Sequence, residues 1–271
     1  MESVKQYYDN YGIKEWKRLI KNPYTQLEFD TTLYFLRKYL PKRGLILDAG
    51  CGPGRYAVTL AKMNYNLVLF DLSPKQLKIA RKKIKENKIE KKVKAIIEGS
   101  IVDLSNFKDN TFDAVLCTGG PLSHVIKYSK REKAVSELIR VAKKNAPIFI
   151  SVIGRLGVLK HELTRNQQEI ENYPHVVEKI LKMGSYDGKI DFTQAHFFTI
   201  KELKKLLNNK VKILEIIGLE GLAALHEKAI IKLYKNHPKA WKTWWKIHLE
   251  TCTIPSVAET SEHIMVICKK R

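Results

Sequence analysis

The sequence predicts an α/β fold: a Rossmann-like, doubly wound and mostly parallel sheet with an antiparallel last strand and helical cap insertions. Three observations support this fold class. From residue 44 onward, short apolar runs alternate with amphipathic helices, which is the pattern of βαβ units. A glycine cluster directly follows the first of these runs. A final apolar run comes after a long helical excursion, so it can enter the sheet in the opposite direction.

The individual elements follow from the spacing of apolar residues. Residues 2–40 are expected to be helical, because apolar residues recur at spacings of three and four, with Pro23 and Pro41 as breaks. Buried strands are expected where apolar runs lack that spacing, at 44–49, 66–71, 93–98, 112–117, 147–152, 211–218 and 262–268. Helices are expected between them, at 55–63, 74–87, 130–141 and 199–207. A capping box of Thr199 and Glu202 opens the last of these helices.

These elements divide the chain into four parts. They are an N-terminal helical cap (1–40), a core (41–153), a cap or lid insertion (154–198), and the end of the core sheet with a helical insertion at about 220–255 (199–271). We expect the helices of 2–40, 154–192 and 220–255 to cover the carboxyl edge of the sheet, where open α/β folds bind ligands. The three tryptophans of the last segment, Trp241, Trp244 and Trp245, are expected to pack as a core against the sheet.

Charge is the most conspicuous property of the composition. The 271 residues include 49 Lys and Arg against 28 Asp and Glu, a net charge of +21, and the basic residues are 39 Lys and only 10 Arg. This excess favours either a nucleic-acid partner or the Lys-rich surface that is common in proteins of hot environments. The basic residues are densest at 75–94, on a helix expected to face away from the ligand edge.

Other composition features exclude several classes of protein. No run of about 18 apolar residues is present, so we expect no membrane span and no membrane partner. The N-terminal residues lack the apolar core of an export signal. The four cysteines are scattered without a CxxC pair, which predicts no metal site and no disulfide framework, and fits a reducing cytoplasm.

The glycine cluster carries the strongest functional signal. Asp48-Ala49-Gly50-Cys51-Gly52-Pro53-Gly54 lies between a predicted strand and a predicted helix, where glycines permit a tight turn and a free helix N-terminus can receive a polar ligand group. Asp71 ends the next strand and can bind both hydroxyls of a ribose. Arg55 stands where a dinucleotide loop needs glycine, and the Gly-Lys-Ser/Thr of a P-loop is missing. The pattern therefore indicates a nucleoside ligand of another kind.

With these motifs, and with Phe112-Asp113-Ala114-Val115 and Arg140-Val141 further on, the sequence resembles the class I, Rossmann-like S-adenosylmethionine-dependent methyltransferases of the small-molecule branch. The resemblance covers about residues 40–153 and implies S-adenosylmethionine as cofactor and S-adenosylhomocysteine as product. It places the loop of Gly50, Cys51, Gly52 and Gly54 under the methionine part, Asp48 near the amino group and Asp71 on the ribose.

The resemblance implies further contacts with the cofactor. Leu72 packs on the adenine, and Ser100 stands where the family often has an aspartate facing the adenine amino group, so recognition there depends more on Ser100 and on the backbone of Ile101. Cys117 and Gly119 leave the fourth strand, where the loop borders both cofactor and acceptor.

Catalytic residues are harder to predict, because methyl transfer needs alignment of the acceptor more than it needs a reactive side chain. His124 is the candidate general base and Tyr8 a second candidate catalytic residue, from an aromatic cluster with Tyr7 and Tyr11 that would fold over the cofactor. Tyr11 and Arg18 are candidate cofactor ligands, Arg18 through the cofactor carboxylate. For each of them, packing or a solvated position is the alternative. His161, His196 and His226 are weaker candidates for substrate contact.

The predicted activity is methylation of an O, N or S atom of a small molecule. The loop from Cys117 to Leu122 lacks the Asn/Asp-Pro-Pro-Tyr/Phe signature of amino-group methylation on bases. Two alternatives remain open. One is methylation of tRNA or rRNA using the basic surface, and the other is a non-catalytic cofactor-binding protein. The oligomeric state stays open.

Overall fold

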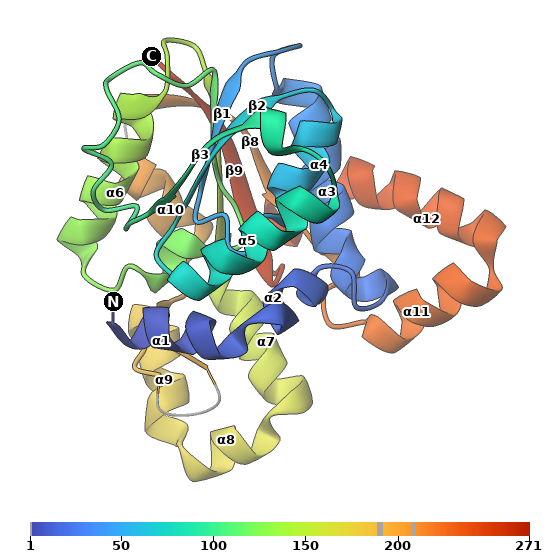
Figure 1. Ribbon diagram of the computed structural model, residues 1–271. Helices are drawn as coiled ribbons and strands as arrows, with labels where there is room; N and C mark the ends of the chain where they lie inside the picture. Colours follow the sequence, from blue (N-terminus) through green and yellow to red (C-terminus); the bar gives the residue numbers. More distant parts are fainter. Residues whose placement is uncertain (1, 189–191, 208–209) are drawn as a thin grey trace.

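The computed structural model describes residues 2–188, 192–207 and 210–271. Its centre is a seven-stranded sheet in the order β3-β2-β1-β4-β5-β9-β8 (Figure 1). The strands are β1 (Leu45–Ala49), β2 (Asn66–Asp71), β3 (Val93–Glu98), β4 (Ala114–Cys117), β5 (Pro147–Ile153), β8 (Val211–Gly218) and β9 (His263–Lys270). β1 to β5 pair in parallel, whereas β9 runs antiparallel between β5 and β8. The predicted fold class, with its antiparallel last strand, is confirmed.

Helices cover both faces of the sheet. One face packs on α3 (Pro23–Tyr39), α4 (Arg55–Lys62) and α5 (Pro74–Glu86), and the other on α6 (Tyr128–Val141) and α10 (Ile200–Leu207). The starts of these helices follow local sequence rules. Ser73 Oγ accepts from the Gln76 amide of α5, and Thr199 and Glu202 form the predicted capping box of α10.

The fourth strand is shorter than predicted. It was expected from Phe112, but the regular ladder begins at Ala114, and Phe112 makes only an isolated bridge to Ala142. The Asp113 side chain explains the late start, because its Oδ2 accepts from the backbone amide of Leu45 at 2.8 Å. The other predicted strands and helices of the core match within three residues.

Two helical segments lie at the carboxyl edge of the parallel strands. The first is α1 (Glu2–Tyr11) and α2 (Ile13–Arg18), which run beside α5. The second, here called the cap, comprises α7 (Arg155–Arg165), α8 (Gln167–Asn172), α9 (Pro174–Met183), β6 (Ser185–Tyr186) and β7 (Ala195–His196). Figure 1 shows α1 lying between the sheet and the cap. Part of the predicted 154–198 insertion, residues 189–191, lies outside the described residues.

The third predicted covering segment is placed differently. α11 (Glu227–Asn236) and α12 (Pro238–Thr251) project sideways from α3 instead of covering the carboxyl edge (Figure 1). The partly buried Trp241, Trp244 and Trp245 pack with Tyr24 and Leu27 of α3, not against the sheet. The expectation of a sheet-facing tryptophan core is therefore wrong, because α3 lies between these helices and the strands. The short α13 (Pro255–Glu259) then leads into β9.

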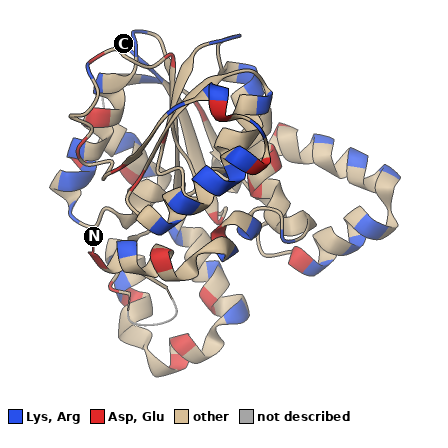
Figure 2. Ribbon diagram, in the orientation of Figure 1, with Lys and Arg blue, Asp and Glu red and all other residues tan. Residues whose placement is uncertain are grey.

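No helix in the described part of the chain is long and apolar enough to cross a membrane. The predicted basic run is carried by α5 and the turn after it, and Figure 2 shows blue segments spread over α5, α6, α11 and α12. The charge is thus distributed over several helices and is not gathered around one edge of the sheet.

Candidate functional site

A pocket opens where β1, β2 and β4 end, beneath α1 and α2. Twelve of the fifteen sequence-predicted site residues line it: Tyr8, Arg18, Asp48, Gly50, Cys51, Gly52, Asp71, Leu72, Ser100, Ile101, Gly119 and His124. They come from segments more than a hundred residues apart in the chain. The parallel strands bring them together, because their carboxyl ends meet at one edge of the sheet.

Three predicted residues do not line this pocket. Cys117 is fully buried in the core below β4, since side chains alternate along a strand and its successor Thr118 faces the pocket instead. Gly54 is the left-handed cap of α4 and lies against Leu69 and Ala80. Tyr11 stacks on Tyr7 with ring centroids 5.8 Å apart.

The glycine loop gives the pocket its shape but few donors. The amides of Gly50 and Cys51 donate to Phe70 O, the amide of Gly52 donates to Asp71 Oδ2 at 2.7 Å, and the amide of Gly54 donates to Cys51 O. These four amides are therefore already paired within the protein. At Gly50, φ is +83° and a Cβ would lie 2.2 Å from Pro121 Cγ, so only glycine fits there.

Asp71 is held in place by two backbone amides. Besides Gly52, the amide of Ser73 donates to its Oδ1 at 2.8 Å. Burial raises the pKa of Asp71 to about 6, and these two hydrogen bonds oppose the rise. Each carboxylate oxygen accepts two hydrogen bonds, so the group retains acceptor capacity toward the pocket.

Four side chains that line the same pocket each have a buried polar atom without a hydrogen-bond partner among the described residues. These atoms are Asp48 Oδ2, Tyr56 Oη, Gln76 Oε1 and Thr118 Oγ1. Asp48 is 1% exposed, and burial, followed by the charge of Asp71, raises its pKa to about 7. Leaving such groups unsatisfied costs roughly 1–3 kcal/mol each, so their presence together indicates a polar ligand.

The two predicted catalytic residues meet at the rim of the pocket. Tyr8 OH lies 2.8 Å from His124 Nε2, and His124 Nδ1 lies 3.0 Å from the carbonyl oxygen of Gln194. A carbonyl can only accept, so Nδ1 carries the proton and Nε2 accepts from the tyrosine. Burial lowers the pKa of His124 to about 4, which keeps the ring neutral near pH 7.

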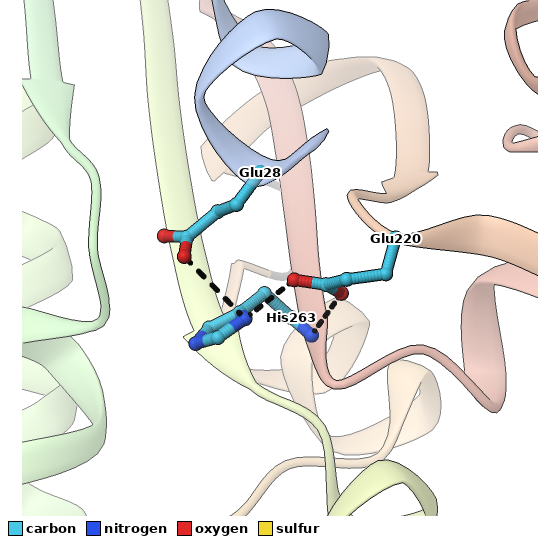
Figure 3. Close-up of side chains that lie close together, drawn as sticks. All are labelled: Glu28, Glu220 and His263. Atoms are coloured by element: carbon cyan, nitrogen blue, oxygen red, sulfur yellow. Dashed lines mark hydrogen bonds and ion pairs between the residues drawn. The ribbon is translucent and has the colours of Figure 1, made fainter. Parts of the chain in front are cut away.

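Arg18 lines the pocket, but its guanidinium is already paired. It donates to Glu15 Oε1 at 2.9 Å and to Glu28 Oε2 at 2.6 Å. Glu28 in turn lies 3.8 Å from His263 Nδ1, which is 2.7 Å from Glu220 Oε1. Figure 3 shows these three side chains pointing toward one another from α3, the loop after β8 and the start of β9.

This Glu28–Glu220–His263 cluster has the spacing of a metal site, with one ligand atom from each residue within 4.8 Å. Its groups nevertheless satisfy one another. Glu220 Oε2 accepts from Ser261 Oγ and from the His263 amide, and the two carboxylates raise the pKa of His263 to about 9 against the effect of burial. A protonated imidazole has no lone pair for a metal, so the geometry describes an ion-paired cluster.

A second cavity of about 360 Å³ lies within the cap. Its walls are mainly apolar and come from α7, α9 and the β6–β7 pair, and it includes His161, one of the weaker predicted contacts. His263 lines this cavity too. Phe192 and Ile153 line this cavity and contact residues at the first pocket: the Phe192 ring centroid lies 5.6 Å from that of His124, and the backbone amide of Ile153 donates to Ser123 Oγ, next to His124.

The other two histidines named from the sequence lie elsewhere. His196 is buried and lies 3.8 Å from Glu202, and His226 stands at the start of α11.

The comparisons with known proteins agree with this site. Residues 46–145, which contain the glycine loop and Asp71, match the methyltransferase domain family. A crystal structure of an S-adenosylmethionine-dependent methyltransferase from Methanosarcina mazei superposes with a TM-score of 0.58, at 21% identity over 87% of this chain and 96% of that one. Residues 46–145 thus carry a methyltransferase domain, and the whole chain has the fold of the class I, Rossmann-like S-adenosylmethionine-dependent methyltransferases. S-adenosylmethionine is the cofactor of this methyltransferase family, and a carboxylate ending β2 with unsatisfied acceptors around it fits a ligand bearing ribose hydroxyls and an amino group.

Relatives in sequence match this chain over part of its length. An uncharacterized protein of Methanocaldococcus jannaschii is 32% identical over 167 residues, which is 60% of this chain and 66% of that protein. Norajmaline N-methyltransferase of Rauvolfia serpentina is 39% identical over 107 residues, which is 39% of this chain and 34% of that enzyme. The chain therefore spans less than two thirds of the length of these curated relatives.

Sequence reasoning missed several residues that line the pocket. Glu15, Gln76 and Pro121 are among them. Gln76 could have been found from the sequence, because it stands in the first turn of the helix after Asp71. Glu15 carried no such signal, because the angle between α2 and the sheet is set by packing.

Proposed function

We propose that this chain transfers a methyl group from S-adenosylmethionine to an O, N or S atom of a small molecule held in the cap cavity. The supporting observation is the pair of neighbouring sites: a pocket with four buried polar atoms that lack a partner among the described residues, and a mainly apolar cavity lined by Phe192 and Ile153. A small-molecule site is typically about 300–1,000 Å³ and mostly apolar, as this cavity is.

Within this proposal, each cofactor contact has a named residue. Asp71 binds the two ribose hydroxyls, Asp48 Oδ2 receives the amino group, and Leu72, Ser100 and Ile101 border the adenine. Bound S-adenosylmethionine supplies an activated methyl group on its sulfonium. The protein's own contribution is to align the acceptor and exclude water.

Tyr8 and His124 have a modest role in proton transfer. Where the acceptor must lose a proton, the Tyr8 hydroxyl receives it while passing its own proton to His124 Nε2, which already accepts that hydrogen bond. Because its pKa is lowered to about 4, His124 is a weak base, so alignment contributes more than proton transfer.

Calorimetry with S-adenosylmethionine and S-adenosylhomocysteine, followed by detection of S-adenosylhomocysteine release with candidate acceptors, tests the proposal. We expect binding that is lost in Asp71→Ala and in Gly52→Val. Unchanged binding in both variants would contradict it. Cofactor binding without turnover of any acceptor would favour a non-catalytic binding protein.

The net charge of +21 favours a second candidate, methylation of tRNA or rRNA. A filter-binding series with tRNA at rising salt distinguishes it, because phosphate contacts make affinity fall steeply with salt. The spread of basic residues over several helices supports the small-molecule proposal instead (Figure 2).

A further inference from the structure

The lining of the cap cavity has the opposite charge from the protein as a whole. Against a net charge of +21, three carboxylates border this cavity, those of Glu162, Glu169 and Glu262. The basic groups in the described lining are two histidines. Burial and the charge of Arg165 lower the pKa of His161, and His263 is already paired with Glu220 and Glu28. Carboxylates therefore outnumber cationic groups in the described lining, and the charge of His263 acts on Glu220, Glu28 and Glu262.

Glu162 is the carboxylate that most needs a partner. It is 7% exposed, and its Oε2 has no hydrogen-bond partner among the described residues. Burial and the neighbouring charge of Glu169 raise its pKa to about 7. Glu262 differs, because the Tyr24 hydroxyl donates to its Oε2. A buried carboxylate of this kind is stabilised by a cationic or hydrogen-bond-donating ligand.

The position of Glu162 on α7 would orient such a ligand. α7 starts directly after Gly154, so its first turn lies next to Ile153, which lines the cap cavity. Eight residues of helix separate Gly154 from Glu162, a rise of about 12 Å. Between these two ends, the wall is built from apolar side chains such as Val158, Val176, Ile180 and Phe197.

We propose that the cap cavity binds an amphipathic small molecule, with its apolar body between α7 and α9 and its basic nitrogen paired with Glu162, remote from the cofactor pocket. The opposite end of the molecule then lies at Ile153 and Phe192, beside the Tyr8–His124 pair. The identification of this molecule as the methyl acceptor rests on the proposed function. The binding of a basic amphiphile in the cavity is independent of the proposed function.

Three probes of equal shape test the charge preference: tryptamine, which is cationic at pH 7.5, its neutral alcohol tryptophol, and the anion indole-3-propionate. Each is titrated by calorimetry into the full chain with S-adenosylhomocysteine present. We expect tryptamine to bind at least about tenfold more tightly than tryptophol, as one buried charge-assisted hydrogen bond predicts, and the anion to bind more weakly still. Equal binding of amine and alcohol, preference for the anion, or binding of none of the three would overturn the proposal.

Variants locate the interaction. Glu162→Gln keeps the size of the side chain, so we expect it to weaken tryptamine binding about tenfold or more and to leave tryptophol binding unchanged. Glu178→Gln on α9 is the control, because Glu178 is exposed and pairs only with Lys182 among the described residues. Unchanged tryptamine affinity in Glu162→Gln, with a melting temperature equal to wild type, would overturn the assignment to Glu162.

One further variant separates this proposal from the proposed function. Asp71→Ala removes the proposed ribose contact, and Asp71 lines the first pocket but not the cap cavity. If wild type binds no cofactor while tryptamine binding depends on Glu162, the proposed function fails and the amine site stands. If wild type binds the cofactor, Asp71→Ala does not, and neither protein binds tryptamine, the amine site fails and the proposed function stands.

Discussion

The two cavities of this protein are built in different ways. The cofactor pocket is made of a backbone turn and of carboxylates at the ends of β1 and β2, so its polar groups are fixed by the register of the sheet. The cap cavity is made of side chains on short helices that contact mainly one another. A change in the first pocket therefore disturbs the core, whereas a change in the second alters one ligand contact. The protein can thus keep one cofactor and vary its acceptor.

The largest effect that would separate the two sites is expected from Asp71→Ala. It removes two charge-assisted hydrogen bonds to the ribose, each worth about 1.5–3 kcal/mol, so cofactor affinity should fall about 100-fold or more. Gly52→Val should do the same, because Gly52 lines the pocket and its φ of +52° disfavours a β-branched residue. Calorimetry measures both. Loss of amine binding in the cap cavity of Asp71→Ala would show that the two sites are not independent.

The ion-paired cluster joins the two sites, and pH tests it. Because the folded pKa of His263 is raised from 6.5 to about 9, its stabilisation is complete below pH 6.5 and is lost as pH rises through 9. The loss should be on the order of 3 kcal/mol in the free energy of unfolding. Urea unfolding from pH 6.5 to 9.5 measures it.

The matched control for this pH effect is His263→Gln. It should be less stable at pH 6.5 and should lack most of the pH dependence over this interval. Asp48 and Glu162, whose pKa values are raised to about 7, titrate in the lower part of this interval, so the two proteins are compared above pH 8, where His263 is the group that differs between them. Equal slopes for the two proteins would mean that the cluster does not hold His263 protonated.

The same contrast explains what the sequence could predict. The strands, the glycine loop and Asp71 are local patterns, so the core could be predicted from the sequence, and twelve of the fifteen candidate site residues line one pocket. The failures depend on tertiary placement. Cys117 and Thr118 differ only in which face of β4 they occupy, and the tryptophans of α12 pack on α3 because α3 intervenes. Glu162 lies on an ordinary helical pattern, and only the folded cap shows that its Oε2 is buried with no hydrogen-bond partner among the described residues.

Two smaller effects are expected from Asp48→Asn: the cofactor-free protein should become more stable, and cofactor binding should become weaker. Its buried carboxylate lacks a partner, so Asp48→Asn removes an uncompensated charge and should stabilise the cofactor-free protein by about 1 kcal/mol at pH 8. The same change should weaken cofactor binding about tenfold, because the amino group loses a charged acceptor. Unfolding and calorimetry on the same samples test both signs. A destabilised variant that binds the cofactor normally would mean that Asp48 serves packing instead.

The smallest effect should come from Tyr8→Phe, at the boundary between the two sites. The change removes the donor to His124 Nε2, while the bond from Nδ1 to Gln194 O keeps the ring in place. Cofactor affinity should stay within about twofold, and turnover should fall about threefold to tenfold, because alignment dominates and the proton path contributes little. S-adenosylhomocysteine release measures turnover. Tyr11→Phe is the control, because Tyr11 lies on the same helix outside the pocket. An equal loss in both variants would reduce Tyr8 to a packing residue, and a loss above about 100-fold would make Tyr8 and His124 the main catalytic pair instead of a minor one.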